Sequence, residues 1–134
     1  MGTWGAAPVG NDTAADFALE LDGQRRWTVV KAALKEATKA GAYIDSDVSQ
    51  IAIAAAEAVA HGLGRPTQTD AYTQSIEQFV GRARRQGRRL AEQATRAVEV
   101  AASTDGELAQ LWGKGGSSEW REAITRLVTN LSAD

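Results

Sequence analysis

"VSQIAIAAAEAVAHGLG" (residues 48–64) is the stretch that decides the fold, because it predicts one long and almost wholly buried helix. Alanines fill many of its positions, so neighbouring helices can approach it closely on more than one side. We therefore expect this helix, opened by an Asp47–Gln50 capping box, to lie at the centre of the protein. Its main apolar residues recur at the period of a helix face: Val48, Ile51, Ala52, Ala55, Val59 and Leu63.

The rest of the chain shows the same helical period in shorter segments. Gly81 and Gly87 each cost about 1 kcal/mol relative to alanine inside a helix, so we expect a break or kink near one of them. Asn11, Asp12 and Thr13 compete as the N-cap of the first segment. The further helical segments are residues 13–23, 27–41, 72–101, 105–112 and 118–131.

Six helical segments in all predict an all-α fold, a compact irregular bundle. The 134 residues are enough for one self-sufficient core, so we expect a single domain over residues 1–134. Glycines and a proline cluster after the central helix, and we expect a flexible loop around residues 62–72.

Composition excludes several classes of function. The chain has no cysteine, which rules out disulfides and thiolate metal sites, and His61 is its only histidine. No window approaches the eighteen or so apolar residues that a membrane span requires, and the N-terminus lacks a basic lead followed by an apolar run. We expect a cytoplasmic, soluble protein without membrane contact, cofactor or bound metal.

Two sets of residues have the spacing of metal or acid–base sites. Asp12, Asp16 and Glu20 recur every four residues, which suits a divalent cation or a general acid–base pair, although acidic residues near a helix N-terminus need no ligand. Glu57 and His61 stand at i, i+4, the spacing of two ligands on one helix face. No second histidine completes such a site, and we expect His61 to bond the last carbonyls of its helix instead. We assign no catalytic residue.

The most concentrated charge in the chain lies between residues 82 and 89. On a continuous helix, residues 85, 88 and 89 would share one side with residue 82 just above them, forming a cationic stripe. Guanidinium groups bind carboxylates and phosphates alike, whereas a solvated basic face needs no partner. We select as candidate partner-binding residues Arg82, Arg84, Arg85, Arg88 and Arg89.

The opening "MGTWGAAPVGNDTAADFALEL" (residues 1–21) carries a resemblance to a known family. Together with "IAIAAAEAVA" (51–60), "GELAQLW" (106–112) and "EWREAITRL" (119–127), it resembles the bacterial family called domain of unknown function 4259. Members open with Met-Gly-(small)-Trp-Gly, a short turn and Asn-Asp before a helix. The resemblance covers nearly the whole chain and implies a fold without an established chemistry. Val9 stands where the family commonly has an aromatic residue, which suggests a smaller apolar plug.

The residues of this opening motif favour a structural role. We expect Trp4 to bury its indole against the helices and Gly5 to permit a tight turn beside it. Asn11 or Asp12 would cap the first helix, on which Asp16 follows.

These patterns predict a small non-enzymatic binding protein that acts by contact with another protein, of the immunity, antitoxin or adaptor type. Its contact surface would be the arginine stripe or residues 62–89. Few aromatic residues suited to base stacking lie near the arginines, only Tyr72 and Phe79, so nucleic-acid binding is the weaker interpretation. A metal-dependent hydrolase built on Asp12, Asp16 and Glu20 is the alternative from a different class. The sequence leaves the oligomeric state open.

Overall fold

Helices account for all the regular structure in the part of the chain that the computed structural model describes, residues 5–40, 44–103, 106–114 and 118–132. No strand occurs within these ranges, which confirms the predicted all-α single domain. The elements are α1 (Asp12–Glu20), α2 (Thr28–Thr38), α3 (Ser46–Gly62), the 3₁₀ helix η1 (Ala71–Thr73), α4 (Gln74–Arg82), α5 (Arg88–Ala101), α6 (Glu107–Lys114) and α7 (Ser118–Ser132). None of the described helices is both long and apolar enough to cross a lipid bilayer.

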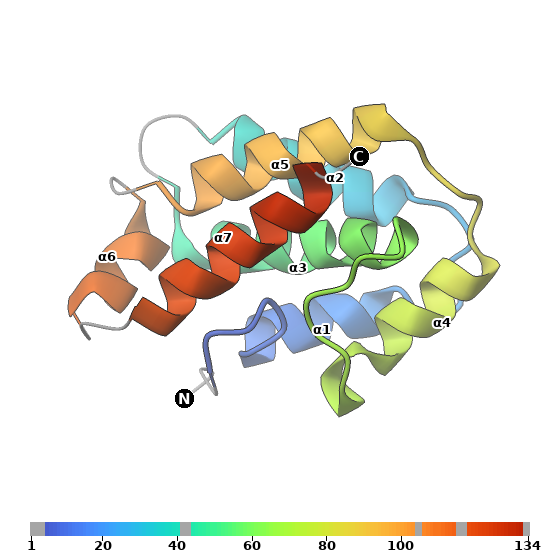
Figure 1. Cartoon of the computed structure of the whole chain (residues 1–134), viewed down its shortest axis with the longest axis horizontal. Coiled ribbons are helices and arrows are strands. Elements are labelled where there is room, and N and C mark those ends of the chain that lie inside the picture. Colours follow the sequence, from blue (N-terminus) through green and yellow to red (C-terminus); the bar gives the residue numbers. More distant parts are fainter. Residues whose placement is uncertain (1–4, 41–43, 104–105, 115–117, 133–134) are drawn as a thin grey trace.

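The helix predicted at the centre is there. α3 packs against α1, α2, α4, α5, α6 and α7, and every residue from 52 to 60 is buried (Figure 1). Its predicted Asp47–Gln50 capping box is wrong: Asp45 is the N-cap and accepts a hydrogen bond from the Val48 amide at 3.0 Å. The helix starts earlier because Glu107, at the start of α6, accepts the Ser46 amide at 2.7 Å and fixes the chain there.

The first two helices follow the predicted apolar stripes. Asn11 is the N-cap of α1, and its side-chain oxygen accepts from the Ala14 amide at 2.8 Å. α1 ends at Glu20, before the predicted Gly23, which lies in a turn at a positive φ of 79°. Trp27 precedes α2 and is buried. The predicted end of this helix at residue 41 lies outside the described residues.

The predicted segment 72–101 is two helices. α4 ends at Arg82, Ala83 is extended, and α5 begins after Gly87 as its N-cap. This confirms the expected break, and residues 83–87 form a linker that runs from one helix to the other at the edge of the molecule (Figure 1). In the described ranges, seven α-helices therefore replace the six segments predicted.

The N-terminal segment forms a tight turn, and this turn has no room for a side chain at Gly10. The Gly5 amide donates to the Gly10 carbonyl at 3.1 Å. A Cβ atom on Gly10 would lie 2.6 Å from the Gly5 carbonyl oxygen, whereas a Cβ on Gly5 would meet nothing within 4 Å. The space around Gly5 would admit a side chain, and its role in the turn stays a prediction. Val9 is fully buried beside it, and Trp4 lies outside the described residues.

Candidate binding surface

The arginine-rich segment is fastened to the fold at its start by Arg82. The guanidinium of this half-buried residue donates to the Gln24 carbonyl at 2.6 Å and to the Leu21 carbonyl at 2.5 Å. These carbonyls lie just beyond the C-terminal end of α1, where a positive charge is favourable. Arg82 thus joins the end of α4 to the end of α1.

A second anchor holds the linker in its middle. The indole nitrogen of Trp27 donates to the Arg84 carbonyl at 2.6 Å. The Trp27 ring is itself fixed by Phe79, which it meets edge-to-face with 4.9 Å between ring centroids. The backbone that carries the arginines is therefore held at Arg82 and again at Arg84.

The five arginines do not form the continuous stripe that the sequence predicted. Because α4 ends at Arg82, the side chains come from a helix end, an extended linker and the first turn of α5. Arg82 faces the fold and its guanidinium binds backbone carbonyls, so it is a structural residue and not the partner-binding residue that the sequence suggested. The remaining four are exposed; we call Arg84, Arg85, Arg88 and Arg89 the arginine surface.

The position of this surface is electrostatically unfavourable for the isolated chain. Arg88 and Arg89 occupy the first turn of α5, where the helix dipole is positive, and Gly87 provides no side-chain cap. Each such charge costs about 0.3–1 kcal/mol at an exposed helix end. Within the described residues, Arg84, Arg85 and Arg89 have no carboxylate within ion-pair distance. Within these described ranges, no neighbouring carboxylate therefore balances the charges of Arg84, Arg85 and Arg89.

We predict that replacing Arg82 by alanine lowers the free energy of unfolding much more than replacing Arg85 does. Arg82→Ala removes two charge-assisted hydrogen bonds and should lower the free energy of unfolding by about 1–3 kcal/mol. Arg85→Ala, at an exposed position, should change it by less than about 0.5 kcal/mol. Urea denaturation followed by tryptophan fluorescence measures both, and equal losses would show that Arg82 has no special structural role.

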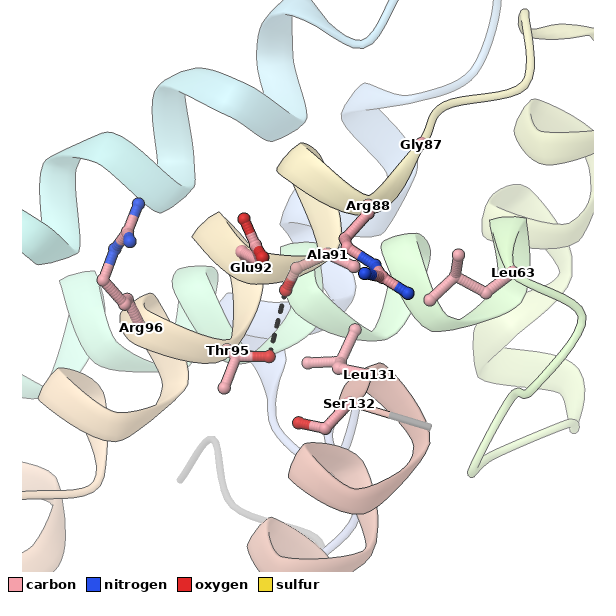
Figure 2. A pocket seen from close by; sticks show the side chains of 9 residues that line it. All are labelled: Leu63, Gly87, Arg88, Ala91, Glu92, Thr95, Arg96, Leu131 and Ser132. Carbon is pink, nitrogen blue, oxygen red and sulfur yellow. Dashed lines mark hydrogen bonds between the residues drawn. The ribbon is translucent and has the colours of Figure 1, made fainter. Parts of the chain in front are cut away.

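A groove of about 700 Å³ begins at the same end of α5. It runs between α5 and the C-terminal end of α7, and Figure 2 shows the side chains around it. Its apolar lining comes from three different helices or their ends: Leu63, Ala91 and Leu131. Its polar lining is Arg88, Glu92, Thr95, Arg96 and Ser132. This volume is typical of sites that take a small molecule or a few side chains of a partner.

The acidic row of α1 forms no such constellation. Asp12, Asp16 and Glu20 are all exposed on α1. A groove of about 400 Å³ does lie beside this helix, but of the three it includes Glu20 alone, among mainly apolar residues. In the described ranges no three side chains of the kinds that bind metals converge on a common point.

Glu57 and His61 do lie in contact, but their contacts match neither a metal site nor a cap on the last carbonyls of α3. The Glu57 side chain is fully buried and its Oε2 lies 3.1 Å from His61 Nε2. That same nitrogen lies 2.9 Å from the Gln68 carbonyl, so the prediction that His61 caps its own helix is wrong. His61 instead holds the loop that follows α3.

Thr67 and Gln68 are the residues that sequence reasoning missed. Glu57 accepts from the Thr67 amide (2.9 Å), the Gln68 amide (2.9 Å) and the Thr67 hydroxyl (2.6 Å). The Gln68 side chain in turn accepts from the Val9 amide at 2.8 Å and donates to the Val9 carbonyl at 3.0 Å. This buried polar network joins α3, the loop and the N-terminal turn. Flexibility of residues 62–72 stays a prediction, and these hydrogen bonds oppose it at Thr67 and Gln68.

Comparison with known proteins agrees with the sequence resemblance. Residues 2–123 match the family described as Domain of unknown function (DUF4259). The chain belongs to this family. The matched range contains the arginine surface and the Glu57 network and ends within α7. No curated protein and no solved structure matches the chain. Membership in DUF4259 therefore assigns the chain to a family and does not assign it an activity.

Proposed function

We propose that this protein is a small non-enzymatic binding protein that recognises an acidic surface of another protein through Arg84, Arg85, Arg88 and Arg89. The observation that carries the proposal is that these exposed side chains stand on a backbone held in place by Trp27. A surface that is ordered before binding loses little conformational entropy when a partner arrives. Arginine at such a surface forms paired hydrogen bonds with carboxylates.

The surroundings of the surface favour protein over nucleic acid. Phe79 is fully buried, so its ring is closed to a base. Tyr72 is exposed but precedes α4, whose nine residues separate it from the arginines by about 14 Å of helix. Recognition of single-stranded nucleic acid relies on bases stacked on aromatic side chains beside the basic groups.

An immunity protein, an antitoxin and an adaptor are the roles that we retain within this proposal, because each acts by binding another protein. The proposed location remains the cytoplasm, which is consistent with a chain that contains no cysteine.

Affinity capture from a nuclease-treated lysate of the source organism tests the proposal. The tagged wild-type chain should retain at least one acidic protein that a variant with Arg84, Arg85 and Arg89 changed to alanine does not retain. Arg25, Arg26 and Arg121 are also exposed, and a variant with alanine at these three positions is the matched control that should keep the partner. Identical protein sets for wild type and arginine-surface variant, or capture that disappears with nuclease treatment, would contradict the proposal.

A further inference from the structure

Two helices that pack against each other, α2 and α5, both begin beside the arginine surface. α5 starts directly after the linker, and the Trp27 indole binds the Arg84 carbonyl within it. Trp27 lies one helical turn before Lys31, whose amide donates to the Trp27 carbonyl at 2.8 Å. The seam between α2 and α5 is therefore continuous with the arginine surface.

A second groove, of about 250 Å³, lies in this seam; we call it the α2–α5 groove. The charged side chains that line it are all cationic and exposed, and we call them the groove cations: Lys31, Lys35 and Arg96. Figure 2 shows the Arg96 side chain directed from α5 toward α2. Among the residues that the structure describes, no carboxylate lies within ion-pair distance of any groove cation. The two lysines, four residues apart on one helix, also repel each other.

Arg89 connects this groove to the arginine surface along α5. Residues 89, 93 and 96 have the i, i+4, i+7 spacing of one helix face, so Arg89 lies on the same side of α5 as the groove residues Gln93 and Arg96. The helical rise separates Arg89 from Arg96 by about 10 Å along the axis. The exposed arginines of the linker, Arg89 and the groove cations therefore form one cationic band.

The size and lining of the α2–α5 groove select its occupant. Its volume is below the roughly 300–1,000 Å³ of sites that hold a whole small molecule, so it suits one or two side chains of a larger partner. The apolar lining residue Leu34 is only 2% exposed, so the surface offered to a partner is charged and polar. Ammonium and guanidinium groups both bind carboxylates.

We propose that the partner contributes an extended acidic segment, which crosses the arginine surface and places one or two carboxylate side chains in the α2–α5 groove. The inference rests on the proposed function and adds to it the path and the chemistry of the bound segment. Charge complementarity excludes a basic segment, because it would bring positive charge to cations that already repel one another. An extended chain advances about 3.3–3.6 Å per residue, so three or four residues span the distance from Arg89 to Arg96.

A synthetic chain of ten glutamates is a direct probe of this segment. Calorimetric titration in about 0.1 M salt, where charges more than about 10 Å apart are largely screened, should show that it binds the wild-type protein. A chain of four glutamates reaches at most about 14 Å and contacts only part of the cationic band. It should bind at least about tenfold more weakly, because contacts linked along one chain reinforce each other.

Changing all three groove cations to alanine should weaken binding of the ten-residue chain at least about tenfold, since each contact between exposed charges contributes up to about fivefold. The variant with alanine at Arg25, Arg26 and Arg121 loses the same total charge elsewhere on the surface. It should bind the chain with wild-type affinity.

Thr38 and Thr125 provide a matched pair of variants that keeps every cation. Both are exposed, and each hydroxyl donates to a carbonyl of its own helix at 3.0 Å, but only Thr38 lines the α2–α5 groove. Thr38→Glu places a carboxylate among the groove cations and should weaken binding about three- to fivefold, whereas Thr125→Glu should leave it unchanged. Far-ultraviolet circular dichroism checks that both variants keep the wild-type helix content.

The outcomes separate this inference from the proposed function. If the ten-residue chain loses affinity when Arg84, Arg85 and Arg89 become alanine but ignores both groove variants, the groove proposal is overturned and the arginine surface stands. Equal losses in the groove and control variants would show a solvated basic face and overturn it too. No binding of the chain, or tighter binding of a ten-residue oligothymidylate, also overturns it. The lysate capture decides the proposed function independently.

Discussion

Replacing Glu57 by alanine should lower the free energy of unfolding by about 3–5 kcal/mol, because it removes the acceptor of several buried or partly buried hydrogen-bond donors at about 1–3 kcal/mol each. The fully buried carboxylate accepts from the Thr67 amide, the Thr67 hydroxyl and the Gln68 amide, so the substitution leaves these donors without their acceptor. A domain of this kind is typically stable by about 5–15 kcal/mol, so this one change removes a large fraction of the total. Chemical denaturation monitored by tryptophan fluorescence measures the loss.

Two further variants make the Glu57 prediction specific. Glu57→Gln keeps the size and one acceptor but turns an amide NH₂ toward hydrogen-bond donors, so it should also destabilise the protein and should speed amide exchange at Thr67 and Gln68. Glu36→Ala, on the exposed side of α2, should change stability by less than about 0.5 kcal/mol. If Glu57→Ala behaves like Glu36→Ala, the network does not hold the loop.

The second large effect is expected at Phe79. Its side chain is fully buried and packs edge-to-face on Trp27, so Phe79→Ala should cost about 3–5 kcal/mol through lost burial and the cavity left behind. Phe79→Leu, which keeps most of the volume, should cost clearly less. Thermal and urea denaturation measure the difference. A loss below about 1 kcal/mol for Phe79→Ala would show that the site collapses around the change.

Phe79 also connects the core to the arginine surface. Trp27, which Phe79 supports, donates to the Arg84 carbonyl in the linker. The near-ultraviolet circular dichroism of Trp27 should therefore change in Phe79→Leu, even though this variant remains folded.

The sequence predicted the helices well wherever an apolar stripe decided them. Residues 48–64 predicted the central helix because their apolar residues recur at the period of a helix and few polar residues interrupt them. The break between α4 and α5 was predicted from the helix cost of Gly81 and Gly87; it lies at Gly87, the N-cap of α5, whereas Gly81 stays within α4. Family membership followed from the opening motif and the later matching stretches.

The predictions that were wrong, and the residues that were missed, depended on contacts between residues far apart in the sequence. Asp45 outcompeted Asp47 as a cap because Glu107, sixty-one residues away from Ser46, fixed the start of α3. Thr67 and Gln68 lie in a loop whose polar sequence predicts exposure to solvent. The residues next to them in the sequence do not indicate that the buried Glu57 binds this loop. Arg82 differs from its four neighbours only because the end of α1 happens to lie within its reach.

The most direct test of the account is the salt dependence of binding between this protein and the partner that it captures. The dissociation constant, measured by calorimetry between low and physiological salt, should rise steeply for wild type, because exposed charges are screened as ionic strength increases. In the variant with Arg84, Arg85 and Arg89 changed to alanine, binding should be at least about tenfold weaker at low salt and nearly independent of salt. Equal affinity and equal salt dependence in wild type and variant would contradict the claim that the arginine surface binds the partner.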